Sequence, residues 1–359
     1  MAKSATARLY NAAVHTLQKR DRTEIRIINA ILSHIEPSPR RTRRRRAPQT
    51  RQQAVWRGFR SVLCPVDFSE HSRQALRYAE AVARRGRATL TVLYVNDPFL
   101  IAAAAAALHD RTLARTSERE LRDFIDATLP RPSRERLRVT TSVTTGAPAA
   151  EILKAARRGR HDLIVLGTHG LTGADRMLMG STTATLLKHA SAPILAIPRS
   201  SPALTPRQRR AWPDGPVVAA IELGAASEKD ATLAADIAHW FGSPLLLAHV
   251  VPEMATPAWL ASTLGFRQRD RARLARAERW LDALAALTRR HVQTTTSAAC
   301  GNLADEIAGR ASASHASLVI TVLRSQRGGA GSARGAVSYE LLSHAVTPVL
   351  ACPARWHRR

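Results

Sequence analysis

The chain has 359 residues, a formal net charge of +26 and 45% hydrophobic residues. This length exceeds one ordinary hydrophobic core, so it predicts about two domains of roughly 150 residues and a tail. The longest apolar run, between Phe99 and Leu108, falls well short of the roughly 20 residues that a membrane-spanning helix needs. The composition therefore excludes a protein with helical membrane spans and favours a soluble globular protein with no membrane partner.

Arginine supplies most of the basic charge, since only five of the 54 basic residues are lysine. Clustered arginine marks nucleic acid or a membrane surface as a partner in many proteins, because it neutralises phosphates and releases counterions. A GC-rich coding genome gives the same excess, and the abundance of alanine agrees with that second explanation. The sequence leaves both open and does not favour nucleic acid.

Three cysteines, Cys64, Cys300 and Cys352, lie far apart without metal-ligand spacing. We expect buried thiols in a reducing compartment. The N-terminus lacks the apolar core of a signal peptide, so a cytoplasmic location is expected.

One long segment of the chain occurs twice. The stretch Leu186–Ala196 (LLKHASAPILA) recurs 155 residues later as Leu341–Ala351 (LLSHAVTPVLA). Further residues match at the same offset: Gly146 with Gly301, Glu151 with Glu306, Gly180 with Gly335 and Pro198 with Pro353. A collinear series at one offset indicates a tandem duplication. We therefore predict two copies of one domain, at 59–200 and 213–355.

Residues 1–58 share neither copy's pattern and form a basic N-terminal extension. The run of six arginines between Arg40 and Arg46 is predicted to be solvated, and the extension partly disordered.

Apolar segments alternate with amphipathic ones in both copies. Five strands are predicted in the first copy: Ser61–Val66, Leu90–Val95, Leu137–Val143, Leu163–Leu166 and Ile194–Ile197. The predicted helices run from the N-cap Ser69 to Arg84, over about 104–129, over Pro148–Arg157 and over Ser181–His189. The second copy repeats the strands at Val217–Ile221, Leu245–Val250, Val292–Ser297, Leu318–Thr321 and Val349–Ala351. This alternation predicts two doubly wound α/β domains, each with a five-stranded parallel sheet covered on both faces.

A glycine-rich loop follows the fourth predicted strand. It has the pattern G-x-x-G-x9-G-S, formed by Gly167, Gly170, Gly180 and Ser181. Glycines let a ligand approach backbone amides closely, and the helix that follows offers free N–H donors and a positive dipole end. The loop therefore suits a phosphate chain, with Ser181 and Thr182 as additional hydroxyl donors. It matches neither a Walker loop nor a dinucleotide fingerprint, and a simple turn is the alternative explanation.

Asp67 stands at the end of the first predicted strand. In an open parallel sheet ligands bind beyond the carboxyl ends of the strands where the strand order reverses. A carboxylate there can accept hydrogen bonds from ribose or from a base. The alternative role of Asp67 is to cap the helix that begins near Ser69.

These residues resemble the universal stress protein family. The resemblance is carried by PVDFS at 65–69, by Gly146-Ala147-Pro148, and by GTHGLTGADRMLMGST at 167–182 followed by HASAPILAIP. It covers nearly all of the first copy and, more weakly, the second. It implies an adenine nucleotide α-hydrolase-like fold with strand order 3-2-1-4-5, a stress-response function, and ATP, with or without Mg²⁺, as ligand.

The resemblance also implies roles for single residues. Asp67 would contact the adenosine part, and Val95 would contact adenine through its backbone. Gly167 and Gly170 would lie along the ribose and phosphates, and the phosphates would be surrounded by Gly180, Ser181 and Thr182. His169 has no assigned role.

The second copy differs from the first at several of the positions predicted to bind the nucleotide. At the offset of 155, Val322 and Ser325 replace the first two glycines, Ala336 replaces Ser181, and Glu222 replaces Asp67. We expect it not to bind ATP and to serve as a structural or regulatory partner that pairs with the first copy within the chain. Binding of another anion by its remaining glycines, and a homodimer, stay open.

No catalytic triad, carboxylate pair or metal cluster is legible, so at most weak ATP hydrolysis is expected. His189 and His344 repeat, and their place in the last turn of a helix explains both. The leading hypothesis is an ATP-binding stress-response protein. The alternative is a nucleic-acid-associated or scaffold protein that acts through its arginine-rich N-terminal arm.

Overall fold

The computed structural model describes residues 56–99, 113–129, 137–168, 180–252, 264–324, 340–342 and 344–356. All of them lie within one unit, residues 55–359. The predicted N-terminal extension falls outside the described residues except for its last three.

The first half of the described chain has the expected alternation of strands and helices. Its strands are β1 Ser61–Val66, β2 Thr89–Asn96, β3 Val139–Thr145, β4 Leu163–Gly167 and β5 Ile194–Ile197. Its helices are α3 Glu70–Gly86, α5 Leu113–Thr128, α7 Pro148–Arg158 and α8 Ser181–His189. The part of the predicted helix that precedes Leu113 lies outside the described residues.

The second half repeats this arrangement after helix α9, Pro206–Ala211. Its strands are β6 Val217–Ala220, β7 Leu245–Pro252, β8 Thr294–Gly301, β9 Leu318–Leu323 and β10 Val349–Pro353. Its described helices are α10 Ser227–Phe241, α12 Leu264–Thr288 and α13 Leu303–Ala313.

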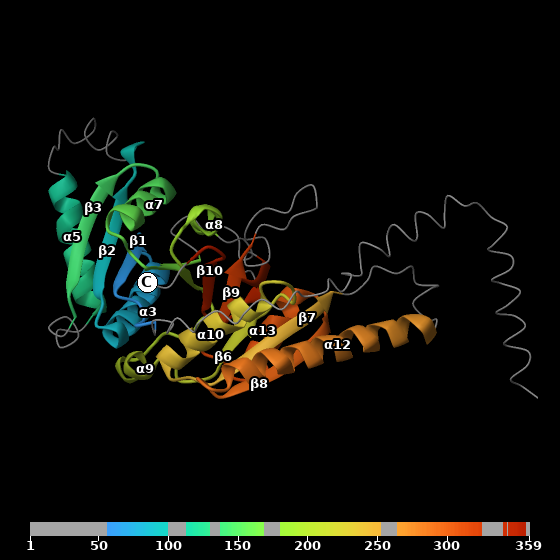
Figure 1. Ribbon diagram of the computed structural model, residues 1–359. Helices are drawn as coiled ribbons and strands as arrows, with labels where there is room; N and C mark the ends of the chain where they lie inside the picture. The colour runs from blue at the N-terminus through green and yellow to red at the C-terminus, as the bar shows by residue number, and fades with distance from the viewer. Residues whose placement is uncertain are drawn as a thin grey trace, which may run out of the picture. The chain divides into compact units, whose positions relative to one another are not determined.

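The ten strands form a single sheet in the order β3-β2-β1-β4-β5-β10-β9-β6-β7-β8 (Figure 1). Each half is parallel and has the order 3-2-1-4-5, so the predicted fold class is confirmed. The offset of 155 holds in the register, because Val62 pairs with Leu163 as Val217 pairs with Leu318. The sequence did not predict the joint between the halves. There β10 runs antiparallel to β5, with Leu350 opposite Leu195.

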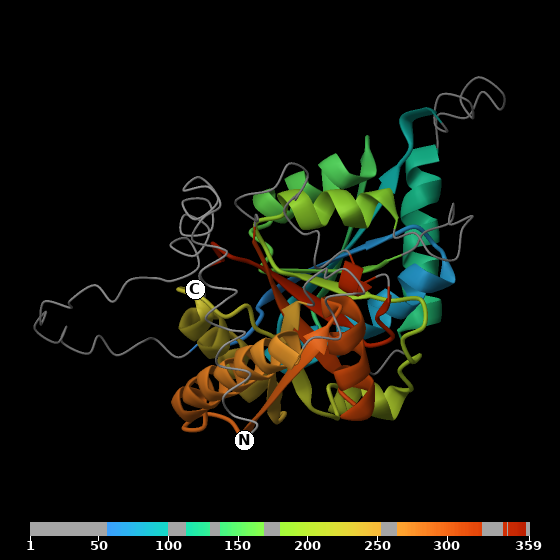
Figure 2. The same cartoon turned by 90° about the vertical axis from the view of Figure 1, so that its right-hand side faces the viewer.

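Helices cover both faces of the sheet (Figure 2). The core on one face includes Tyr78 of α3, Leu121 of α5, Ile237 of α10 and Leu281 of α12. The core on the other face includes Ile152 of α7, Leu186 of α8 and Ile307 of α13. Two of the three cysteines, Cys64 and Cys352, are buried as expected, whereas Cys300 is only partly buried.

Aromatic rings join the two halves on the face that α3 and α10 cover. Trp240 of α10 packs against Trp56 and Phe59, which precede β1, with ring centroids 5.5 Å apart in both pairs. Gly58, between these two rings, has a φ of +83°, and a Cβ there would lie 1.9 Å from Nε1 of Trp240. Only glycine fits this position, so the close approach of the segment before β1 to α10 depends on it.

A buried ion pair holds α9 onto the first half. Arg209 of α9 places Nη1 2.8 Å from Oε2 of Glu80 in α3, and Nη2 of Arg84 lies 3.1 Å from Oε1 of the same carboxylate. The side chains of Glu80 and Arg209 are 1% and 6% exposed. A buried charge is tolerated only when it is paired, so each group depends on the other.

Replacing Arg209 with alanine is expected to lower the free energy of unfolding by about 3 kcal/mol, because the buried Glu80 carboxylate loses a partner. Urea unfolding measures this effect. Arg207→Ala changes an exposed residue of the same helix and should shift the midpoint little. Equal midpoints for the two variants would contradict the assigned role of the pair.

Candidate functional site

The carboxyl ends of β1 and β4 form the first switch point of the sheet. Among the described pairs, β1 follows β4 only as far as Leu63↔Ile164, whereas it follows β2 as far as Val66↔Tyr94. Strand order reverses between these two strands, since β2 and β5 lie on their outer sides. Doubly wound proteins bind their ligands at such a position, and the predicted site residues cluster around it.

Asp67 follows β1 directly and is half-buried. Its Oδ1 accepts hydrogen bonds from the backbone N–H of Ser69 at 3.1 Å and from the Ser69 hydroxyl at 2.5 Å. Ser69 is the N-cap of α3, and its Oγ accepts from the N–H of Ser72 at 3.1 Å. Phe68 makes the tight turn possible with a φ of +63°. Asp67 therefore supports the start of α3, and a contact with a ligand is a further role predicted for the same carboxylate.

Val95 lies near the end of β2, where β1 has already ended. The carbonyl of the next residue, Asn96, accepts from the N–H of Gly146 at 3.1 Å, on the β3 side. Alternate residues of a strand direct their backbone groups to opposite edges. Val95 therefore directs its N–H and C=O toward the β1 side, as a backbone contact to a ligand at the first switch point requires.

Two of the predicted glycines stand where close packing or a helix start explains them. A Cβ on Gly167, the last residue of β4, would lie 3.2 Å from the carbonyl oxygen of His71 in α3. Gly180 donates its N–H to the carbonyl of Thr168 at 2.8 Å and is the N-cap of α8, without a side-chain cap. The first-turn N–H groups of α8, including those of Ser181 and Thr182, therefore have no N-cap side chain to accept their hydrogen bonds. Such a helix end carries partial positive charge and is suited to an anion.

The structure thus brings most of the predicted residues to the ends of neighbouring strands. Asp67 and Gly167 lie at the ends of β1 and β4, and the start of α8 is tied to β4 through Thr168. Gly170, within residues 169–179, lies outside the described residues.

Sequence reasoning missed two hydroxyl groups that hold this arrangement. Ser72 Oγ accepts from the N–H of Asp67 at 3.3 Å, and Thr183 Oγ1 donates to the carbonyl of Gly167 at 3.2 Å. The signal for Ser72 was its position three residues after the N-cap Ser69. Thr183 carries no comparable local signal.

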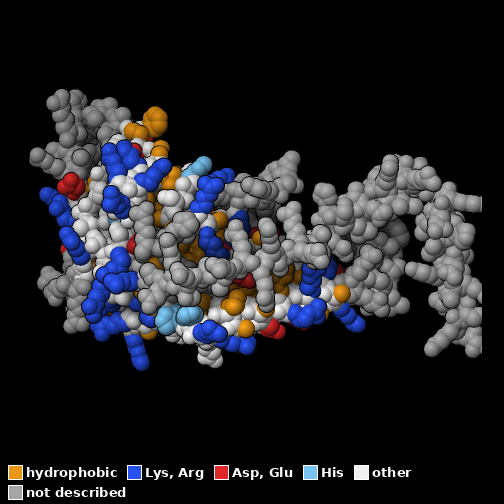
Figure 3. Space-filling model, viewed as in Figure 1, with side chains coloured by type: hydrophobic (Ala, Val, Ile, Leu, Met, Phe, Trp, Pro, Cys, Tyr) orange, Lys and Arg blue, Asp and Glu red, His pale blue; other side chains and the backbone are white. Residues whose placement is uncertain are grey.

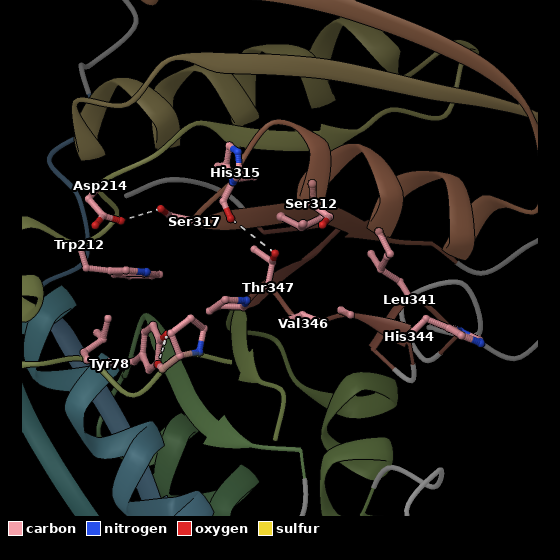
Figure 4. A pocket seen from close by; sticks show the side chains of 18 of the residues that line it. Tyr78, Trp212, Asp214, Ser312, His315, Ser317, Leu341, His344, Val346 and Thr347 are labelled. Atoms are coloured by element: carbon pink, nitrogen blue, oxygen red, sulfur yellow. Dashed lines mark hydrogen bonds between the residues drawn. The ribbon is translucent and has the colours of Figure 1, made fainter. Parts of the chain in front are cut away.

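A separate pocket of about 610 Å³ lies between the segment around α9 and the amino ends of β9 and β10. In Figure 4, Tyr78 and Trp212 lie on one side of it and Thr347 on the other. Its lining includes Ser312 at the end of α13 and none of the predicted nucleotide-binding residues. The carboxyl end of a helix carries partial negative charge, which disfavours the binding of a phosphate. The first switch point is therefore the better candidate for an anionic ligand.

The universal stress protein family model matches residues 58–198 and 215–353. The chain belongs to the universal stress protein family. It contains two tandem universal stress protein domains, and the matches include both switch points of the sheet.

Single-domain relatives align with 39% of this chain. A universal stress protein of Methanocaldococcus jannaschii is 27% identical over 139 residues, which cover 82% of that relative. One from Thermus aquaticus is 29% identical over 141 residues, 98% of its length.

Two solved structures align with most of the chain. A universal stress protein from Archaeoglobus fulgidus has a TM-score of 0.54 at 17% identity, covering 83% of this chain and 98% of its own. A protein of unknown function from Pseudomonas aeruginosa has a TM-score of 0.56 at 17% identity, covering 83% and 93%. At this identity the likeness shows the fold alone. Within the described part of the chain, no helix combines the length and apolar character needed to cross a membrane.

The second switch point, at the carboxyl ends of β6 and β9, contains an ion pair that the first domain lacks. Nη2 of Arg324, just after β9, pairs with Oδ2 of Asp230 in the first turn of α10. Asp230 is 5% exposed, and at its equivalent position the first domain has Ala75. Burial raises the pKa of Asp230, and the charge of Arg324 opposes this rise. The side chain of Arg324 thus extends across the second switch point, from the end of β9 to α10.

Replacing Asp230 with asparagine is expected to change how stability depends on pH. A carboxyl group with a raised pKa in the folded state stabilises the protein below its unfolded pKa, and this contribution is lost as pH rises through the folded pKa. The quantity to compare is the difference between the free energies of unfolding of the wild type and of Asp230→Asn. This difference should fall as the pH rises from 3.8, the ordinary pKa of an aspartate, toward neutrality.

Urea unfolding across this pH range measures the difference. Asp305→Asn, in the first turn of α13 and exposed, controls for the loss of a carboxylate at a helix start. A difference that grows with pH would show that the ion pair with Arg324 outweighs burial.

Proposed function

We propose that the first universal stress protein domain binds one ATP per chain in a stress response, and that the second domain is its structural or regulatory partner. The main support is the contrast between the two switch points. Gly167 ends β4 in the first domain, whereas Val322 stands at its equivalent in β9. The first has an uncapped helix N-terminus next to the strand ends. The second is spanned by the side chain of Arg324, paired with Asp230.

Each part of the nucleotide has a group suited to it at the first switch point. The amides of Ser181 and Thr182 would donate to phosphate oxygens, and Gly180 presents no Cβ toward them. The carboxylate of Asp67 would accept from ribose hydroxyls, and the backbone of Val95 would face adenine. Mg²⁺, where it accompanies ATP, is held largely by the phosphates and by water. Occupancy of this site would tie α8 to the ends of β1 and β2, and so would alter the surface offered to a partner.

Calorimetric titration of ATP into the full-length protein is expected to give close to one site per chain. Gly180→Val places a branched side chain at the entry to α8 and should weaken binding by at least about tenfold, since charge-assisted hydrogen bonds are lost. Gly335→Val, the equivalent change in the second domain, should leave binding unchanged. A folded wild-type protein that binds no ATP would refute the proposal.

Asp67→Asn separates the two roles of this residue. Asparagine keeps an Oδ1 that accepts from Ser69, so α3 should start normally and the melting temperature should change little. The neutral amide is a weaker acceptor for ribose hydroxyls, so ATP affinity should fall by about tenfold. Unchanged ATP affinity in this variant would reduce Asp67 to its role in supporting α3.

A further inference from the structure

Exposed arginines lie at the amino ends of four strands of the first domain, β1 to β4. Arg60 precedes β1, Arg87 lies just before β2, and Arg138 precedes β3. Arg158 ends α7, and Arg160 lies between α7 and β4. We call these five residues the arginine edge. Parallel strands start at the same edge of a sheet, so these side chains follow one another along that edge. In Figure 3 basic side chains are spread over the left part of the molecule, which is the first domain, and also lie along α12.

The order of the strands spaces these charges in a line. Along the sheet the arginines follow the order β3, β2, β1, β4, and adjacent strands lie about 4.8 Å apart. Backbone hydrogen bonds fix this arrangement: Thr89 N donates to the carbonyl of Arg60 at 3.0 Å, and Leu90 N donates to that of Arg138 at 2.9 Å. The sheet register therefore fixes the backbone of Arg60 and Arg138, whereas Arg87, Arg158 and Arg160 are held by the ends and turns of α3 and α7.

Carboxylates offset the positive charge of the edge only in part. Burial raises the pKa of Asp162, and the charge of Arg60 opposes this rise. Arg158 adds to the effect of Lys154 in lowering the pKa of Glu151. No ion pair joins any of the five arginines to a carboxylate of the described residues. The carboxylate nearest in sequence, Asp162, is directed at the backbone, where it accepts from the N–H groups of Arg60 at 2.8 Å and Ser61 at 3.0 Å.

The second domain shows that the fold does not require these arginines. Their equivalents at the offset of 155 are Gly215, Gly242, Gln293, Ala313 and His315. Strands β6 to β9 nevertheless pair in the same register as β1 to β4. The second domain has exposed arginines before β8 alone, Arg289 and Arg290, so a line that continues across four strands occurs only in the first domain.

We propose that the arginine edge binds the phosphate backbone of a nucleic-acid strand without reading its sequence. A line of guanidinium groups matches a linear chain of phosphates, to which arginine donates in bidentate fashion. A membrane surface fits less well, because interfacial binding also draws on buried apolar side chains. The large exposed apolar residues of the described chain, Phe99, Trp280, Leu287 and Val346, all lie on other parts of the molecule. This activity is independent of ATP binding at the opposite ends of the same strands.

The test compares two full-length variants that each lose four positive charges. The edge variant carries Arg87→Gln, Arg138→Gln, Arg158→Gln and Arg160→Gln; Arg60 is kept because its Nη1 donates to the carbonyl of Gly86 at 2.9 Å. The control variant carries Arg271→Gln, Arg276→Gln, Arg279→Gln and Arg290→Gln, all exposed residues on or next to α12. The basic run between Arg40 and Arg46 remains in both. Thermal melts by circular dichroism establish that both are folded.

Fluorescence anisotropy with a labelled single-stranded RNA of mixed sequence measures affinity between about 50 and 200 mM salt. The edge variant is expected to lose at least about tenfold in affinity, and its slope of log K against log salt should shrink by about 3. The control variant should stay close to the wild type. Equal losses in both variants would overturn the proposal, because net charge alone would then explain binding. Binding of the wild type to phosphatidylserine vesicles but not to RNA would overturn it in favour of a membrane.

Discussion

Strands β5 and β10 pair antiparallel, and this short contact sets how the two domains face each other. Because the paired strands are equivalent in the two copies, the domains are related by an approximate two-fold rotation, as in an isologous dimer. Equivalent residues accordingly meet near the axis: Arg85 Nε donates to the carbonyl of Trp240, 155 residues later, at 2.8 Å. The end of β5 also lies beside the start of β10, so the chain contacts the second domain as soon as it leaves the first. Ser201 Oγ donates to the carbonyl of Val346 at 2.7 Å.

The shared register of the two domains makes their differences at the switch points interpretable. In the first domain Ser69 caps α3, and Asp67 holds Ser69. In the second domain Gly224 stands in place of Ser69, and α10 begins only at Ser227, with an N-cap that makes no side-chain hydrogen bond. The changed helix start accompanies the pairing of Asp230 with Arg324. A single set of linked substitutions thus removes the helix cap, exchanges the Asp67 carboxylate for the longer Glu222, and places an arginine side chain across the strand ends.

The sequence predicted the features that depend on local pattern or on the repeat. Short apolar runs located the strands, Ser69 located the start of α3, and the offset of 155 anticipated that Val62 and Val217 have equivalent partners. It did not predict the pairing of β5 with β10. Both strands are short and apolar, they are not joined by a hairpin turn, and an apolar strand carries no pattern that specifies which strand lies beside it. Nor did it predict the pairing of Asp230 with Arg324, which lie far apart in the chain. At the candidate site, sequence located Asp67 and the start of α8, whereas the hydroxyl of Thr183 became visible only once β4 and α8 were placed together.

Helix ends and composition account for only part of the arginine edge. A cation in the last turn of a helix interacts favourably with the helix dipole, which explains Arg158 at the end of α7. Helix α13, its counterpart, meets the same requirement with Arg310 alone. Arg60 and Arg138 precede strands, where net dipoles are small, so no such explanation applies to them. A GC-rich composition raises arginine in both domains, yet the second domain carries its exposed arginines on α12, before β8 and after β10, and has none of the five at the equivalent positions. Because the same register forms without them, the alignment of these arginines along one edge is better explained by an anionic partner than by folding.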